Sequence, residues 1–131
     1  MVAHLSEVAI TQKQPAHLRQ GRDAENRACE HLGHHGLTLL ERNYRTPFGE
    51  IDLIMQHQQT VVFVEVRYRR SQEYGAPAET IDARKQGKLR ATAAHYLQRH
   101  KSAARKPCRF DVVAVSGSAG EERIQWLQNA F

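Results

Sequence analysis

Residues 49–70 read GEIDLIMQHQQTVVFVEVRYRR, and this stretch decides the fold. Two runs of β-prone residues, 50–56 and 60–69, flank the polar residues HQQ, a pattern typical of two strands joined by a short turn. Such a hairpin brings neighbouring side chains of its two strands together. We therefore predict that Asp52 and Glu65 lie side by side, inside the most apolar segment of the chain.

Side chains alternate between the two faces of a strand, and this alternation predicts what accompanies each carboxylate. One face of the first strand is expected to carry Glu50, Asp52 and Ile54, and the other face Ile51, Leu53 and Met55. One face of the second strand is expected to carry Val61, Phe63, Glu65, Arg67 and Arg69, and the other face Val62, Val64 and Val66.

Two ionised carboxylates held close together and half-buried repel each other and lose hydration. A bound divalent cation removes that objection, because carboxylate oxygens are the ligands that Mg²⁺ prefers. A salt bridge from a carboxylate to Arg67 or Arg69 is the alternative. The spacing alone leaves both interpretations open.

The segments around this hairpin predict two helices and three further strands. Apolar residues recur with helical spacing from Gln20, and again from Thr80 or Asp82 to His100. Residues 37–45, 108–116 and 123–128 read as strands, the last at a sheet edge, and SAARKP (102–107) reads as a loop. Short turns make the first three strands antiparallel, and the second helix permits a parallel crossover to the fourth. The prediction is an α/β fold in the order αβββαβ, with a mixed sheet of four to five strands flanked by helices.

The length and composition fit one globular domain. The chain has 131 residues, of which 1–17 are expected to form a flexible tail and 18–131 a single domain. The N-terminus lacks the pattern of a signal peptide. The longest uncharged run, Leu53 to Val64, is too short to span a bilayer. A cytoplasmic location without a membrane partner is the resulting expectation.

Positive charge is concentrated in one block of the sequence. Between Asp82 and Asp111 there are nine of the 19 basic residues and no acidic one. Such a block suits a polyanion, because each neutralised phosphate releases condensed counterions. A solvated basic helix face is the alternative that charge alone leaves open.

Several motifs follow one another from Gly21 to Phe131: GRDAEN, NYRTPFGEIDLI, VVFVEVR, YGAPAE, RKQGKLRATAAHYL, RFDVVAV and a terminal NAF. Together they resemble the YraN family, which is similar to the Holliday-junction-resolvase branch of the restriction-endonuclease-like PD-(D/E)xK nucleases. The resemblance implies a restriction-endonuclease-like core and Mg²⁺-dependent hydrolysis of phosphodiester bonds in DNA, with Mn²⁺ able to substitute. It also leaves a homodimer open, because resolvases cut symmetric strands.

Carried over by position, the resemblance assigns roles to five residues. Asp52 corresponds to the metal-binding aspartate, Glu65 to the acidic residue of the (D/E)xK element, and the backbone carbonyl of Val66 to a further metal ligand. Glu25 resembles the helix glutamate that completes such sites. Glu50 belongs to the GEIDLI signature, where it would hold an arginine or an outer-sphere water.

The sequence departs from the family pattern at Arg67, which stands where the catalytic lysine is usual. Arginine can bind a phosphate bidentately, but it does not give up a proton near neutral pH. A metal-activated water does not strictly need a lysine base, so the departure leaves cleavage open. Lys85, at the start of the second helix, is the nearest candidate for a substituting ammonium. A nucleic-acid-binding module that has lost cleavage is the alternative function.

Two further groups of residues bear on nucleic acid. The predicted contacts to phosphates are Arg69, Arg70, Arg84, Lys85, Lys88 and Arg90. Four aromatic side chains could stack on bases: Tyr44, Phe48, Tyr68 and Tyr74. Tyrosines more often pack against the protein with a solvated hydroxyl. Asp111 is expected to be structural, bonded to Arg109 or to a basic residue of the second helix.

Overall fold

The computed structural model describes residues 16–69, 81–117 and 123–131. The elements along the chain are helix α2 (Ala16–His34), strands β1 (Leu37–Thr46), β2 (Gly49–His57) and β3 (Thr60–Arg69), helices α3 (Ala83–Arg99) and α4 (Lys101–Ala104), and strands β4 (Cys108–Ser116) and β5 (Arg123–Leu127). Helix α2 begins at Ala16, four residues before the predicted start. Residues 1–15 of the predicted tail, Arg70 and the loop with Tyr74 lie outside the described residues.

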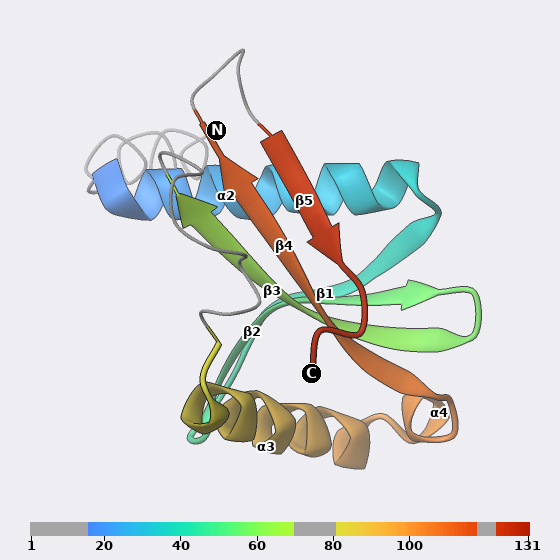
Figure 1. The fold of residues 1–131 in the computed structure, drawn as a ribbon. Helices are drawn as coiled ribbons and strands as arrows, with labels where there is room; N and C mark the ends of the chain where they lie inside the picture. The colour runs from blue at the N-terminus through green and yellow to red at the C-terminus, as the bar shows by residue number, and fades with distance from the viewer. Residues whose placement is uncertain (1–15, 70–80, 118–122) are drawn as a thin grey trace, which may run out of the picture.

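The five strands form one mixed sheet in the order β1-β2-β3-β4-β5 (Figure 1). Strand β2 pairs antiparallel with both β1 and β3. Strand β4 pairs parallel with β3, and β5 pairs antiparallel with β4. The predicted fold class is therefore confirmed, including the parallel crossover through α3 and the short edge strand. A parallel neighbour needs a long connection, and the segment with α3 and α4 provides it.

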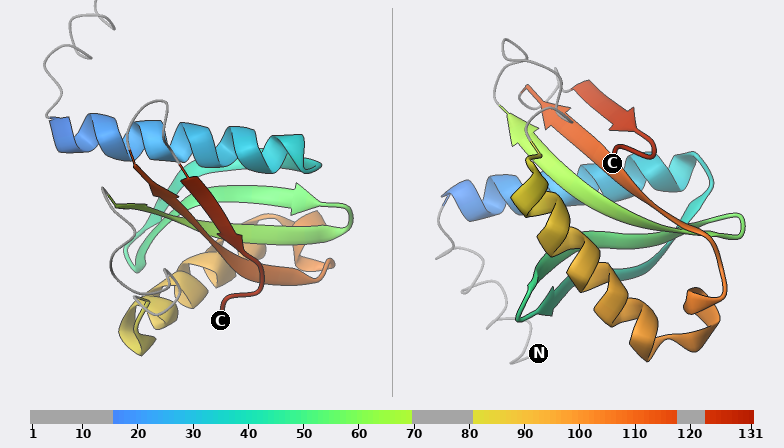
Figure 2. Two further views of the ribbon diagram at one scale, coloured as in Figure 1. Left: turned by 45° about the horizontal axis from the view of Figure 1, so that its top comes forward. Right: turned by 60° about the horizontal axis from the view of Figure 1, so that its bottom comes forward.

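The sheet lies between two helices, α2 on one face and α3 on the other (Figure 2). Apolar side chains of each helix pack on the sheet and make two core clusters. The cluster under α2 includes Ala24, Ala28, Leu32, Leu53, Met55, Val62, Val64, Val113 and Val115. The cluster under α3 includes Ile51, Ile54, Val61, Phe63, Leu89, Ala93, Tyr96, Phe110 and Val112. In β3 the predicted alternation is thus confirmed.

Helix α3 begins where the sequence provides a cap. The side chain of Asp82 accepts a hydrogen bond of 2.8 Å from the backbone N–H of Lys85, which satisfies one of the free donors of the first turn. The prediction of a loop at 102–107 is wrong in part, because Lys101–Ala104 form the short helix α4. Burial of Ala103 against the core under α3 stabilises this turn, and a four-residue helix leaves no periodicity to detect.

The predicted alternation fails in β2 at Asp52. Ile51 belongs to the cluster under α3 together with Ile54, whereas Leu53 and Met55 belong to the cluster under α2. Pairing with β3 runs from His57–Thr60 to Leu53–Val64 and stops there. Figure 1 shows the two strands diverging from that point. A strand segment that is no longer paired with its neighbour can twist independently, and here Ile51 packs on the face opposite to Leu53.

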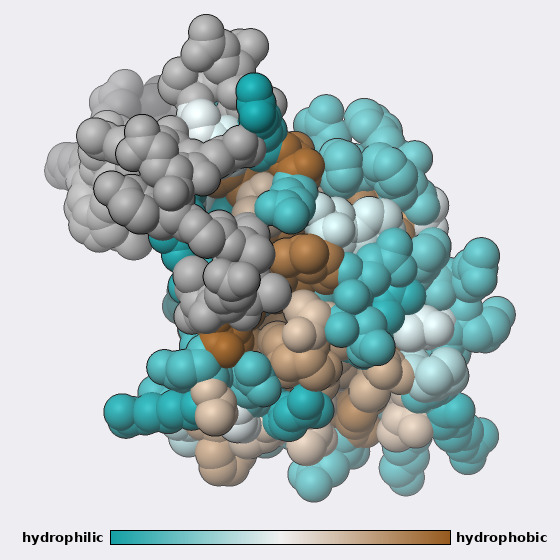
Figure 3. Space-filling model, in the orientation of Figure 1, coloured by the Kyte–Doolittle hydropathy of each residue, from teal (hydrophilic) through white to brown (hydrophobic). Residues whose placement is uncertain are grey.

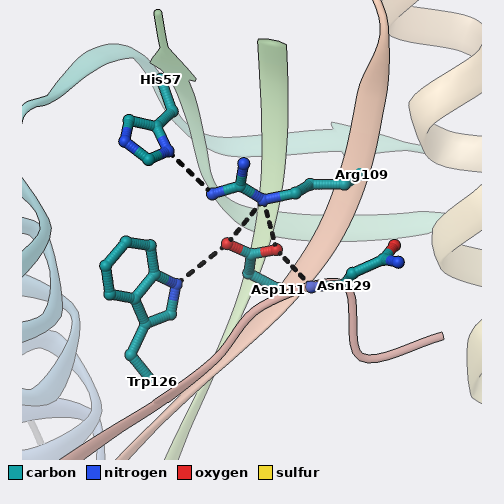
Figure 4. A network of polar contacts seen from close by, with 5 residues as sticks. All are labelled: His57, Arg109, Asp111, Trp126 and Asn129. Carbon is teal, nitrogen blue, oxygen red and sulfur yellow. Dashed lines mark hydrogen bonds and ion pairs between the residues drawn. The ribbon is translucent and has the colours of Figure 1, made fainter.

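A polar network ties β5 and the C-terminal segment to the sheet (Figure 4). The buried carboxylate of Asp111 accepts hydrogen bonds from Arg109 Nε at 3.0 Å, from Trp126 Nε1 at 2.9 Å and from the backbone N–H of Asn129 at 2.9 Å. The guanidinium of Arg109 also lies 3.1 Å from His57 Nδ1. The prediction that Asp111 is structural and bonded to Arg109 agrees with this arrangement.

Candidate functional site between strands β2 and β3

Asp52 occupies the gap that opens where β2 and β3 part. Its Oδ2 accepts a 2.8 Å hydrogen bond from the backbone N–H of Val66, a donor that would otherwise lack a partner on β2. The N–H and C=O of one strand residue point to the same side, so the Val66 carbonyl is directed toward the same gap. The structure therefore brings together the Asp52 carboxylate and the backbone group that the resemblance assigned to the metal.

Glu65 lies across the gap on the face of β3 that α3 covers. Its side chain is only 8% exposed, and its Oε2 lies 3.4 Å from Lys85 Nζ and 3.6 Å from Arg67 Nε. Of the two interpretations left open by the spacing, the salt bridge to Arg67 is present, and Lys85 forms a second ion pair with the same carboxylate. Lys85 reaches the site because Asp82 starts α3 beside it. The sequence alone could name Lys85 as a candidate, but not place it against Glu65.

The electrostatics of the gap act mainly on Asp52. The pKa of the Asp52 carboxyl is raised to about 8, first by burial and then by the negative charge of Glu65. The hydrogen bond from Val66 N–H opposes this shift, and the charges of Glu25 and Glu50 add smaller increases to the Asp52 pKa. Three acidic side chains therefore act on Asp52.

Asn43, on the edge strand β1, joins the two outer carboxylates. Its Nδ2 donates hydrogen bonds of 3.1 Å to Glu25 Oε1 and of 3.1 Å to Glu50 Oε1. Glu50 also forms an ion pair of 3.3 Å with Arg45, in line with the expectation that it holds an arginine. Sequence reasoning missed Asn43. The available signal was an asparagine inside a strand, where it is disfavoured; here it adopts the left-handed conformation, with φ 49°, that asparagine tolerates.

The oxygen donors at the gap suit a hard divalent cation that is held by few protein groups and keeps several waters. Within residues 16–69, 81–117 and 123–131, no three His, Cys, Asp or Glu side chains are arranged to hold a metal ion together. The charge of Glu65 acts on Asp52 more strongly than that of Glu25, so Asp52, Glu65 and the Val66 carbonyl are the groups at the gap that could hold such an ion. Mg²⁺ commonly uses one or two carboxylates and keeps several waters, so this set is compatible with it.

The predicted phosphate contacts divide into groups. Arg84 and Lys88 are exposed on α3. Hydrophilic side chains lie along the lower edge of the molecule in Figure 3, where Figure 1 places α3. Arg69 is half-buried at the end of β3. Lys85 faces Glu65, and the guanidinium of Arg90 lies over the rings of Phe110 and Phe131 at 5.3 and 5.4 Å. Arg90 thus contributes to packing at the C-terminus.

Replacing Asp52→Asn is expected to stabilise the protein at pH 8. Below about pH 4 the Asp52 carboxyl is protonated in both the folded and the unfolded state. As the pH rises, Asp52 ionises first in the unfolded state. The free energy of unfolding therefore falls until the pH passes the folded-state pKa of about 8. The amide oxygen can still accept from Val66 N–H and carries no charge. Thermal melts should show a gain of several degrees at pH 8 and a smaller one at pH 5. Equal gains at both pH values would contradict this account.

The fold and site define a class: an α/β protein with a mixed sheet between two helices and a buried pair of carboxylates beside cationic side chains. The chain belongs to the Uncharacterised protein family UPF0102, whose model matches residues 24–115. A UPF0102 protein of Pseudomonas fluorescens is 49% identical over 116 residues, covering 88% of this chain and 95% of that protein. One of Nitrosomonas europaea is 53% identical over 112 residues, covering 86% and 92% respectively.

Among solved structures, SfsA of Pyrococcus furiosus in complex with Ca²⁺ matches with a TM-score of 0.38 and 16% identity, covering 83% of this chain and 62% of that one. In the part of the chain that the structure describes, no helix is both long and apolar enough to cross a membrane.

Proposed function

We propose that the protein is a metal-dependent endonuclease that hydrolyses phosphodiester bonds in DNA. The observation that carries this proposal is the gap between β2 and β3, where Asp52 and Glu65 meet with the Lys85 ammonium 3.4 Å from Glu65. Buried carboxylates of like charge are unfavourable unless a cation accompanies them. Exposed Arg84 and Lys88 on the adjoining helix suit the phosphates of a nucleic acid.

Each residue of the gap has a role in this proposal. Asp52, Glu65 and the Val66 carbonyl would hold Mg²⁺, with Mn²⁺ able to substitute. The bound cation would supply a Lewis acid for the phosphate and would lower the pKa of a water. Arg67 binds and orients the phosphate with its planar guanidinium. Lys85 places a compact positive charge where negative charge develops on the phosphate.

The alternative function is a nucleic-acid-binding module without cleavage. The observation that favours it is the double ion pair on Glu65, because Arg67 at 3.6 Å and Lys85 at 3.4 Å already compensate its charge. A carboxylate neutralised by two cations has less need of a metal ion. In that case the same basic surface would hold DNA or RNA for a partner protein.

The deciding experiment incubates the purified protein with Mg²⁺ or Mn²⁺ and with single-stranded, duplex, flap and four-way DNA. Cleavage by the wild type and none by Asp52→Asn or Glu65→Gln would support the nuclease; the two variants also exclude a contaminating enzyme. Calorimetry should detect Mn²⁺ binding to the wild type and not to Asp52→Asn. Binding without cleavage of any DNA would favour the module. Preferred cutting of four-way DNA would support a branched substrate and, with it, a homodimer.

Nucleic-acid binding is expected to be mainly electrostatic. The logarithm of the affinity should fall linearly with the logarithm of the salt concentration, with a slope that reflects several phosphate contacts. Replacing Arg84 and Lys88 with alanine should make that slope shallower by about two contacts. Fluorescence anisotropy with a labelled oligonucleotide at several salt concentrations measures it. An unchanged slope would place the contact surface away from α3.

A further inference from the structure

Phe48 is the most exposed large apolar side chain among the described residues, with 54% of its surface accessible. It lies in a two-residue loop, because Thr46 is the last paired residue of β1 and Gly49 the first of β2. Loops of this length usually contain asparagine or glycine. A phenylalanine at such a tip contributes little to the core, so its exposure calls for another explanation.

The loop holds Phe48 in one position. The Thr46 hydroxyl accepts hydrogen bonds from the backbone N–H groups of Phe48 at 3.1 Å and Gly49 at 3.3 Å. Pro47 restricts the backbone immediately before Phe48. An aromatic ring on a rigid loop loses little entropy when it binds a partner.

The tip is also fixed against the basic helix. Gly49 approaches α3 so closely that a Cβ atom there would lie 3.4 Å from Thr92 Oγ1 and 3.6 Å from Lys88 Cβ. Figure 1 shows this turn beside the N-terminal part of α3. Helix α3 therefore places Lys88 next to the loop and Lys85, one turn earlier, at Glu65.

The surroundings of Phe48 carry a net positive charge. Arg45, three residues before it, is 75% exposed and is paired with Glu50, whereas α3 adds the exposed cations Arg84 and Lys88. An apolar ring among positive charges matches a nucleobase that is flanked by phosphates. A purely apolar protein surface would not benefit from these charges. Asp52 lies four residues further along the chain, roughly 13 Å for an extended segment, which corresponds to about four base-pair steps.

We propose that Phe48 stacks on an unpaired or unstacked base of DNA at the edge of the site, and so selects strands that are open at a fork, flap or junction. This inference rests on the proposed function only in requiring that the protein binds DNA. A base within a continuous duplex offers no free face to the ring, because both faces are already stacked on their neighbours.

The test measures binding in EDTA, so that cleavage plays no part, to a forked DNA and to a blunt duplex of the same length. Phe48→Ala is expected to weaken binding to the fork by about 5- to 100-fold, and to leave duplex binding unchanged. Phe48→Trp should bind the fork like the wild type, because tryptophan stacks on a base at least as well as phenylalanine. Phe48→Leu keeps an apolar side chain without a ring and should behave like the alanine variant. Melting temperatures check that each variant is folded.

The outcomes separate this inference from the proposed function. If the wild type binds the fork and Phe48→Ala binds it equally well, the stacking role is wrong and the nuclease proposal is unaffected. If Phe48→Leu binds like the wild type, the side chain acts as an apolar contact, suited to a protein partner, and base stacking is likewise overturned. If the wild type binds neither DNA, both proposals fail together.

Discussion

Lys85→Ala is expected to lower the single-turnover rate of DNA cleavage by about 10²- to 10⁴-fold, the usual contribution of a positioned proton-transfer or charge-stabilising group. The Lys85 ammonium lies 3.4 Å from Glu65, so its removal takes away the compact cation of the site. The cap on α3 uses the backbone N–H of Lys85 and survives the change. The affinity for DNA should fall only by the contribution of one phosphate contact. Cleavage is measured at saturating protein with Mg²⁺ or Mn²⁺.

Lys88→Ala is the matched control, because it removes the same charge from the same helix one turn away. It should weaken binding at low salt and leave the rate at saturation unchanged. Arg67→Lys provides the reverse test and should alter the rate by less than about tenfold, since Lys85 already supplies an ammonium. A rise of 10²-fold or more with Arg67→Lys, or wild-type cleavage by Lys85→Ala, would show that Lys85 does not have this role.

Asp111→Ala is expected to destabilise the protein by about 3–5 kcal/mol, the usual consequence of leaving a buried charge without its partner. The carboxylate is fully buried and accepts from Arg109, Trp126 and the backbone of Asn129. Its loss leaves three donors unsatisfied and removes one of the contacts between the C-terminal segment and β4. Such a loss is a large fraction of the free energy of unfolding of a small domain, so the midpoint of urea unfolding should fall clearly.

Asp82→Ala serves as the comparison for Asp111. Asp82 is exposed, and its side chain accepts one backbone hydrogen bond at the start of α3, so its replacement should cost only about 1 kcal/mol. Similar effects of the two substitutions would mean that the Asp111 network contributes no more than an exposed cap. Asp111→Asn, which keeps an acceptor and loses the charge, should lie between them.

The order of the elements and the pairing of the strands could be predicted from the sequence, because they depend on local patterns. Alternation in β3 placed Val61, Phe63 and Glu65 on one face, and short turns made β1, β2 and β3 neighbours. The meeting of Asp52 with Glu65 follows from the same hairpin. These features need only the period of a strand and the length of a turn.

Tertiary structure decided the rest of the site. The divergence of β2 from β3 at Leu53–Val64 moved Ile51 to the other core and opened the gap, and neither can be read from a period of two. The ion pair of Lys85 with Glu65 and the bridge from Asn43 to Glu25 join segments distant in sequence. Such contacts depend on how helices dock on a twisted sheet, so local sequence determines which residues are available and packing determines which of them meet.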